Sequence, residues 1–148
     1  MKRCILVAVG FALVVLGFGA AAFCEDVSTL PIAIKSYRGI PYIDSGIGLD
    51  ERKALAIIGK DYNLKLVFYV TTREYLADVD LAVRDSAGNT LIDLVSEGPW
   101  FFTKLPPGMY TAEATAMGKK IRKRVRVKNN GQAEVRFVWK KTEPDEPK

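Results

Sequence analysis

Alternating apolar and polar positions dominate the chain after residue 61. Val79, Leu81 and Val83 alternate with polar neighbours such as Asp80 and Arg84, which predicts a strand with one buried and one solvated face. Short runs of this kind recur between turn residues, a pattern typical of a sandwich or barrel. Seven strands are predicted, at residues 64–70, 77–84, 90–95, 100–105, 109–116, 121–127 and 133–139.

The apolar spacing of residues 49–58 predicts a helix instead. Asp50 suits the helix N-terminus, Leu55 and Ile58 lie on one stripe, and Gly59 is typical of a residue that ends a helix. A helix of this length is marginal alone in water, so Leu55 and Ile58 are expected to dock it onto the strands. The segment before it, rich in proline and glycine, follows neither period, and an irregular lead-in is expected there.

A two-residue turn at Gly118 and Lys119 is predicted between the fifth and sixth strands. This register places Glu113 opposite Arg124 and directs Tyr110 toward the core, together with Ala112 and Ala114. The polar side chains of both strands then share the solvated face.

A three-residue loop at residues 129–131 is predicted to join the last two strands as a hairpin. It pairs Val127 with Ala133, whereas a two-residue loop would set an inward valine against an outward glutamate. Lys123 has the parity of the inward residues, which indicates either an edge strand protected against aggregation or a bulge.

Trp100, Phe101 and Phe102 are consecutive in the predicted fourth strand, so at least one ring leaves the core. We expect the docked helix to cover it, because large bare aromatic patches are uncommon. An uncovered Trp100 could instead stack on a sugar.

The first residues predict a secretory signal peptide. Lys2 and Arg3 precede an apolar run, and Ala20 and Ala22 suit a cleavage site after residue 22. An uncleaved membrane anchor and a lipid on Cys24 are the alternatives. The expected organisation is a signal peptide at 1–22, a lead-in with the helix at 23–61, the sandwich at 62–139 and a disordered tail at 140–148.

The residue types present exclude several kinds of chemistry. The chain has no histidine, which removes Ser-His-Asp catalysis and histidine zinc sites, and no metal or cofactor site is expected. Both cysteines, Cys4 and Cys24, lie in or beside the export segment, so packing alone must hold the sandwich. Asp78 and Asp80 are expected on one strand face, where surface acids are usually only solvated. The net charge of +5 includes Lys2 and Arg3, and no nucleic-acid partner is expected.

Seven cations within ten positions form the densest charge cluster of the chain. They are Lys119, Lys120, Arg122, Lys123, Arg124, Arg126 and Lys128. Such a stripe can bind lipid phosphate or an acidic glycan, or it can be an ordinary solvated strand face whose repulsion Glu113 and Glu134 offset. The candidate ligand-binding residues are Lys119, Lys120, Arg122, Arg124, Arg126 and Trp100.

Residues 105–112 read Leu-Pro-Pro-Gly-Met-Tyr-Thr-Ala, with an aromatic strand before them and two predicted hairpins after them. Over residues 62–139 the chain resembles the carboxypeptidase regulatory-like domains, which are transthyretin-like sandwiches. With residues 48–52 and 62–68, it is similar to short exported bacterial proteins that carry such a domain. The resemblance implies an accessory module without catalytic residues. The hydroxyisourate hydrolases of a related fold need histidines and a C-terminal Tyr-Arg-Gly-Ser, and this chain has neither.

These observations predict an all-β fold: a seven-stranded transthyretin/Ig-like β-sandwich preceded by one short docked helix. The predicted function is that of a non-catalytic accessory or binding module of the periplasm or cell envelope, with an envelope protein or a polysaccharide as partner. The first alternative is a purely structural domain, which is tethered to a membrane if the N-terminus is uncleaved or Cys24 is lipidated. A histidine-free hydrolase is the second.

Overall fold

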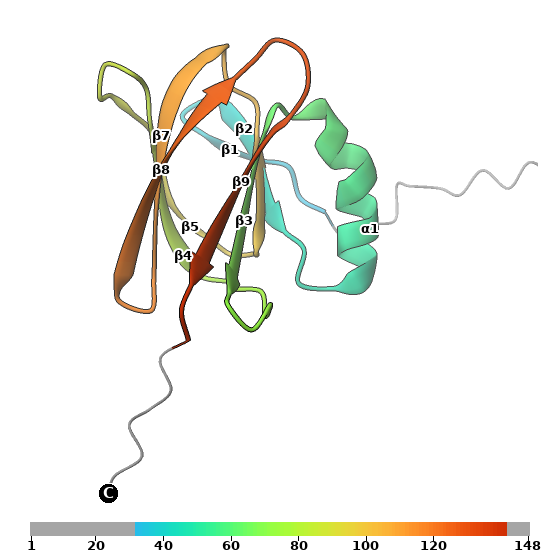
Figure 1. Cartoon of the computed structure of the whole chain (residues 1–148). Coiled ribbons are helices and arrows are strands. Elements are labelled where there is room, and N and C mark those ends of the chain that lie inside the picture. The colour runs from blue at the N-terminus through green and yellow to red at the C-terminus, as the bar shows by residue number, and fades with distance from the viewer. Residues whose placement is uncertain (1–31, 142–148) are drawn as a thin grey trace, which may run out of the picture.

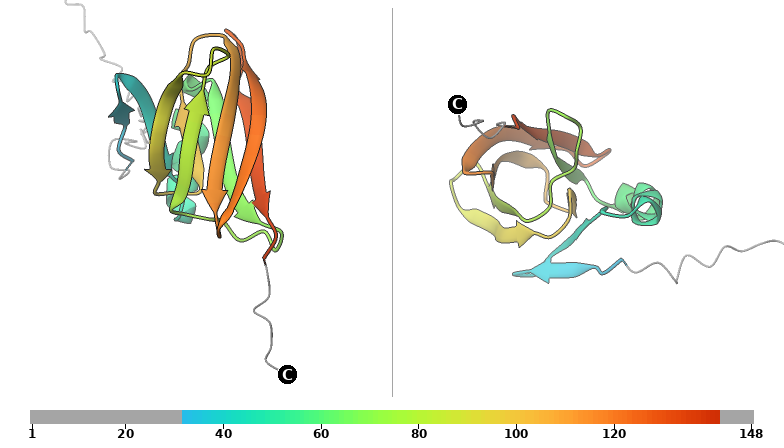
Figure 2. Two further views of the ribbon diagram at one scale, coloured as in Figure 1. Left: turned by 90° about the vertical axis from the view of Figure 1, so that its left-hand side faces the viewer. Right: turned by 90° about the horizontal axis from the view of Figure 1, so that it is seen from below.

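Two β-sheets face each other in the computed structural model, which describes residues 32–141 (Figure 1). Sheet A contains, in spatial order, β1 (Lys35–Tyr37), β2 (Ile40–Ser45), β6 (Trp100–Thr103), β3 (Leu64–Val70) and β9 (Ala133–Trp139). Sheet B contains β5 (Thr90–Ser96), β4 (Val79–Arg84), β7 (Gly108–Ala116) and β8 (Lys119–Val127). The helix α1 (Leu49–Ile58) and the short 3-10 helix η2 (Gly59–Asp61) lie outside sheet A, as the end-on view in Figure 2 shows. The predicted all-β sandwich with one short helix is confirmed, with nine strands instead of seven in the described part.

The predicted alternation in β4 is confirmed, because Val79, Leu81 and Val83 are all buried between the sheets. Sheet A contributes larger side chains to the same core, where the rings of Phe68 and Phe137 lie 5.7 Å apart. Burial of these apolar surfaces is the main stabilising term in a domain without disulfides.

The expectation of an irregular lead-in is wrong, because β1 and β2 form a hairpin at the edge of sheet A. Tyr37 pairs with Ile40, and the two turn residues Arg38 and Gly39 have φ values of 49° and 83°, as a type I′ turn requires. Ile43 of β2 then pairs with β6. Strands this short show no measurable period in the sequence, and their pairing comes from the rest of the sheet.

The predicted hairpin between the last two strands is also wrong. β8 belongs to sheet B, whereas β9 pairs in parallel with β3 of sheet A, with Phe68 next to Phe137. The segment 129–131 therefore crosses from one sheet to the other. Hydrophobic parity placed Val127 and Val135 correctly in the core, but parity fixes the buried face of a strand and not its partner.

The turn between β7 and β8 lies one residue earlier than predicted, at Met117 and Gly118. Both have positive φ, 53° and 71°, so the turn is type I′ with glycine in its second position. The pairing of β7 with β8 therefore shifts by two residues from the predicted register. Each side chain stays on its predicted face of the sheet, but Glu113 lies opposite Arg122 instead of Arg124. Lys123 pairs with the buried Ala112 and so lies on the inward face, as expected, but its side chain is exposed. Of the two explanations that the sequence left open, an edge strand or a bulge, the structure shows the edge strand.

The helix begins and ends at the predicted residues. Leu55 is fully buried against Phe102 of β6 and Ile43 of β2, which confirms that α1 covers an aromatic side chain on the outer face of sheet A. Gly59 does not take the left-handed conformation expected of it, since its φ is −62° and the chain continues into η2. A Cβ there would lie 2.5 Å from the Phe102 ring, so close approach requires the glycine.

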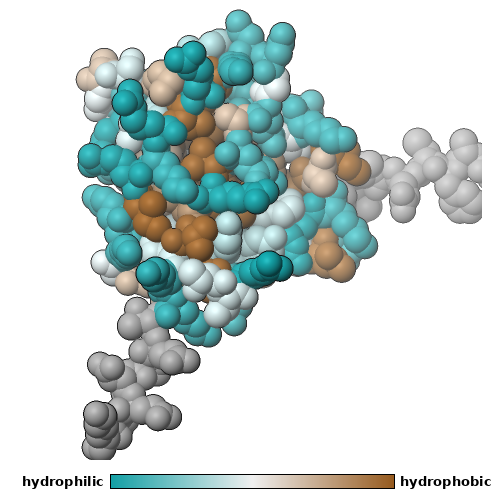
Figure 3. All heavy atoms as spheres, in the orientation of Figure 1, coloured by the Kyte–Doolittle hydropathy of each residue, from teal (hydrophilic) through white to brown (hydrophobic). Residues whose placement is uncertain are grey.

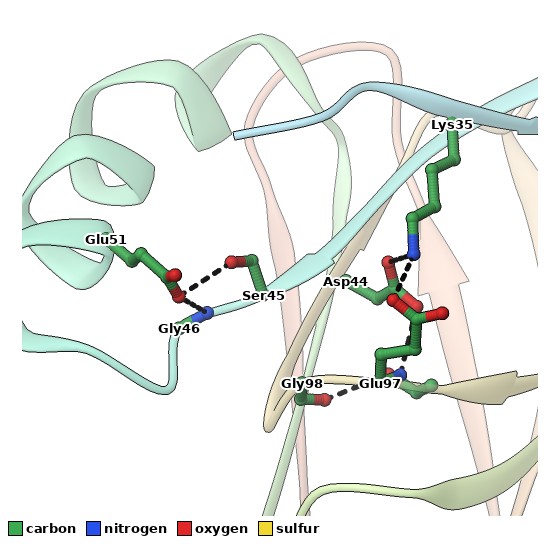
Figure 4. A network of polar contacts seen from close by, with 8 residues as sticks. Lys35, Asp44, Ser45, Gly46, Glu51, Glu97 and Gly98 are labelled. Carbon is green, nitrogen blue, oxygen red and sulfur yellow. Dashed lines mark hydrogen bonds and ion pairs between the residues drawn. The ribbon is translucent and has the colours of Figure 1, made fainter. Parts of the chain in front are cut away.

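Two polar contacts fix α1 and β1 to the sandwich (Figure 4). Ahead of the helix, the Glu51 carboxylate accepts hydrogen bonds from the Ser45 hydroxyl at 2.8 Å and from the Gly46 amide at 3.1 Å. The Ser45 hydroxyl and then the Gly46 amide lower the pKa of Glu51. These bonds hold the turn from which the helix starts.

The second contact joins β1 to the connection between β5 and β6. Lys35 Nζ lies 2.6 Å from Glu97 Oε2 and 2.9 Å from Asp44 Oδ1, and Asp44 accepts the Glu97 amide at 3.0 Å (Figure 4). The hydrogen bond to Glu97, partly opposed by burial, raises the pKa of Lys35. This trio ties the edge hairpin of sheet A to the end of sheet B.

Candidate functional site

An open groove of about 490 Å³ lies on the outer face of sheet A, beside α1. We call it the aromatic groove. Eight residues from β3, β6, β9 and the β3–β4 loop line it: Lys65, Val67, Tyr69, Arg73, Tyr75, Trp100, Glu134 and Arg136. It combines aromatic rings with charged groups, the usual composition of a site for a polar ligand.

Parallel pairing of β3 and β9 creates the charged side of the groove. Lys65 is the partner of Glu134, and Val67 is the partner of Arg136. The Glu134 carboxylate therefore lies between two cations, 3.2 Å from Lys65 Nζ and 2.6 Å from Arg136 Nε. Burial opposes ionisation of Glu134, but the hydrogen bonds from Arg136 and Lys65 prevail and lower its pKa.

Aromatic rings form the other side. Trp100 of β6 meets Tyr75 edge to face, with 6.2 Å between ring centroids. Lys65 Nζ lies 4.2 Å from the centre of the Trp100 ring, within cation–π range. Arg52 of α1 lies over the Tyr75 ring at 5.3 Å. The cations thus order the rings without filling the groove.

The β3–β4 loop presents Tyr75 on a fixed backbone. Val70 N–H donates to Glu74 C=O at 2.9 Å, and Leu76 N–H donates to Phe68 C=O at 3.0 Å. The loop therefore pairs with the part of β3 that extends beyond Trp100, the first residue of β6. Tyr75 is nevertheless 47% exposed. A large ring held rigidly in solvent loses little conformational entropy when a ligand binds to it.

Backbone strain occurs in the same loop, because Arg73 has φ 68° without being a glycine. Its guanidinium joins Lys65 and Arg136 along the groove, where Glu134 is the one carboxylate among the lining residues. The groove is therefore net positive. An anionic ligand with apolar ring faces matches both sides of it.

The sequence candidates do not form one site. Trp100 lies on the outer face of sheet A, whereas the five cations Lys119, Lys120, Arg122, Arg124 and Arg126 lie on β8 in sheet B. Four of these five alternate along the outer face of that sheet, and Lys119 begins the strand after the turn.

Part of the basic stripe is neutralised. Glu113 of β7 is only 5% exposed, and its carboxylate lies 2.6 Å from Arg122 and 2.8 Å from Arg84. Lys120 is farther, at 3.8 Å. Arg124 and Arg126 have no ion pair within residues 32–141, and they border shallow depressions of about 380 and 260 Å³. The pairs around Glu113 support the interpretation of the central stripe as a structural face.

The sequence alone does not single out most of the groove residues. Lys65 and Tyr69 share the outward parity of β3, but the charged side is completed by β9, and parity does not show that β9 pairs with β3. Tyr75 lies in a loop, where alternation carries no signal. A tyrosine among polar loop residues is the one clue that the sequence offers.

Asp78 and Asp80, which were expected on one face of a strand, do not share one. Asp80 is in β4, whereas Asp78 precedes the strand and has φ 54°. Within the described residues there is no group of three histidine, cysteine or acidic side chains that could hold a metal ion.

The expected signal peptide, Cys4, Cys24 and most of the predicted tail lie outside the described residues. No helix within residues 32–141 has the length and apolar character needed to cross a membrane. No family model matches the chain, and no curated protein is significantly similar to it.

Proposed function

We propose that the protein is a non-catalytic binding module of the cell envelope whose aromatic groove takes an acidic polysaccharide. The observation that carries this proposal is the rigid, half-exposed Tyr75 beside Trp100, in a groove lined by three cationic side chains. Sugar rings present apolar faces to aromatic rings, and uronate carboxylates pair with arginine. Export, the carboxypeptidase regulatory-like relationship and the accessory role remain predictions from the sequence.

The ionised state of Glu134, the carboxylate among the groove residues, supports binding without catalysis. Glu134 already accepts bonds from two cations, and its lowered pKa keeps it ionised at neutral pH. It is therefore a poor proton donor. We expect the bound saccharide to be released unchanged.

The test uses oligogalacturonate, which carries carboxylates, and the matching neutral galactan oligosaccharide. Binding is followed by calorimetry and by tryptophan fluorescence. Tyr75→Ala should weaken oligogalacturonate binding by about tenfold, the effect of removing a central aromatic contact. Arg73→Gln should weaken it to a similar extent and reduce its dependence on salt.

Arg38→Gln is the matched control. Arg38 is also exposed, has positive φ in a turn and lies 5.4 Å from a tyrosine ring, that of Tyr37, but it is at the β1–β2 hairpin outside the groove. Its loss should leave binding unchanged. Equal binding of the neutral oligosaccharide, or cleavage of either one, would refute the proposal.

A further inference from the structure

One end of the sandwich collects exposed apolar and cationic side chains from separate segments. The β7–β8 turn, the β3–β4 loop, the end of β9 and the start of α1 all lie at the lower end of the molecule in Figure 1, and the left view of Figure 2 agrees. We call this the basic end. Its members are Ile47, Leu49, Arg73, Met117, Lys119, Lys120, Lys140 and Lys141.

Contacts connect these segments into one surface. The Trp139 indole N–H of β9 donates to the Lys119 carbonyl at 2.8 Å, which joins the end of β9 to the β7–β8 turn. Lys141 lies 3.4 Å from Glu74 of the β3–β4 loop. The next residue of that loop, Tyr75, lies under Arg52 of α1. The basic end is thus a continuous rim and not a set of unrelated tips.

Met117 is the most unusual residue of this rim. It is 54% exposed at the tip of a two-residue turn, and its φ of 53° is one that methionine rarely adopts. Lys119 and Lys120 follow directly and are exposed. Ile47 and Leu49, more than 60% exposed, extend the apolar character to the start of α1. Packing of the sandwich does not explain why the apolar side chains of Met117, Ile47 and Leu49 are exposed to water.

The charges of the rim favour an anionic partner. Three acids at this end are paired with lysines: Asp50 with Lys53, Glu74 with Lys141 and Glu97 with Lys35. Glu51 accepts hydrogen bonds from the turn before α1. The exposed Asp78 and Asp80 oppose an anionic partner, whereas Arg73, Lys119 and Lys140 attract one and have no ion pair within residues 32–141. Apolar tips within a collar of lysine and arginine are the composition of surfaces that insert shallowly between anionic lipid headgroups. A soluble polyanion would use the cations but not the apolar side chains.

We infer that the basic end docks on an anionic lipid surface, with the Met117 turn inserted at headgroup depth. Arg73 borders both this surface and the aromatic groove, but the Met117 turn does not line the groove, so neither contact requires the other. Docking at this end would leave the outer face of sheet A open to the side, roughly perpendicular to the membrane.

Hydrogen exchange of the full chain on lipid vesicles tests this inference. The readout is the exchange of the backbone amides from Met117 to Lys120, which reports on the turn even if residues 1–31 also attach to lipid. Exchange should slow on phosphatidylglycerol vesicles and not on phosphatidylcholine vesicles. Met117→Asn combined with Lys119→Glu should weaken this protection by at least about tenfold in lipid concentration, since it removes the apolar tip and inverts a charge.

The variant pair separates docking from misfolding. Asn-Gly is the preferred pair for a type I′ turn, so Met117→Asn should raise the melting temperature while it weakens lipid binding. Lys128→Glu, just beyond the other end of β8, should leave the protection unchanged. Unaltered exchange at the turn, an equal loss in Lys128→Glu, or equal protection by soluble polygalacturonate would overturn the inference.

Discussion

Glu113 shows how one buried carboxylate organises the basic face of sheet B. Burial alone would favour its neutral form, but the bonds from Arg84 and Arg122 prevail, and the pKa of Glu113 is lowered. A lowered pKa in the folded state contributes stability above the unfolded value of about 4.3. That contribution is lost as the pH falls through the folded pKa.

Glu113→Gln should therefore reduce the free energy of unfolding by about 1–2 kcal/mol at pH 7, a modest value because both arginines are partly solvated. Below the folded pKa the native carboxylate is protonated, so the two proteins should become equally stable. Urea unfolding from pH 7 to pH 3 measures the difference. Glu74→Gln, at an exposed pair with Lys141, is the control and should have little effect. A difference in the free energy of unfolding between the parent protein and Glu113→Gln that stays constant with pH would contradict this role of Glu113.

At the scale of elements, α1 depends on a small apolar cluster separate from the main core. Leu55 is fully buried with Ile43, Tyr62 and Phe102, whereas Ile57 on the same helix is 60% exposed. A ten-residue helix without this cluster would be marginal. Trp100 packs against the same cluster and also lines the aromatic groove, so docking of α1 affects one wall of that groove.

Leu55→Ala should cost about 2–5 kcal/mol, as a cavity at a fully buried leucine does. Ile57→Ala should change stability by less than about 0.5 kcal/mol. Chemical denaturation measures both, and tryptophan fluorescence reports on the environment of Trp100. Similar losses in the two variants would show that the helix is held by something other than its buried face.

The elements also show what alternation in the sequence can predict. The bounds of β3, β9 and α1 follow from period and turn residues, because side-chain burial repeats every two residues in a strand and about every 3.6 in a helix. The period of burial does not specify which strands pair, and so the predicted hairpin of β8 and β9 is wrong although the bounds of β9 are right. Since the charged side of the groove exists only through that parallel pairing, the site could not be predicted beyond Trp100.

At the scale of the whole molecule, the two sheets meet along an open seam between β8 and β9. The strands lie next to each other without forming a ladder, since β8 ends sheet B and β9 ends sheet A. Figure 3 shows this side, where hydrophilic side chains lie across a band of hydrophobic ones. Lys123 spans the seam: its Nζ donates to the Arg136 carbonyl at 2.7 Å and lies 5.8 Å from the centre of the Phe137 ring.

Exposed strand edges pair readily with other chains, and a lysine at the edge is a common protection. Lys123→Leu should leave the Arg136 carbonyl without its donor and place an apolar side chain at the seam, so the protein should self-associate. Light scattering coupled to size-exclusion chromatography measures the mass. Arg124→Leu, on the outer face of the same strand, removes one charge and adds the same apolar side chain away from the seam. The Arg124→Leu variant should have the same mass in solution as the parent protein. Equal association of both variants would mean that surface hydrophobicity, and not the loss of Lys123 at the seam, drives the assembly.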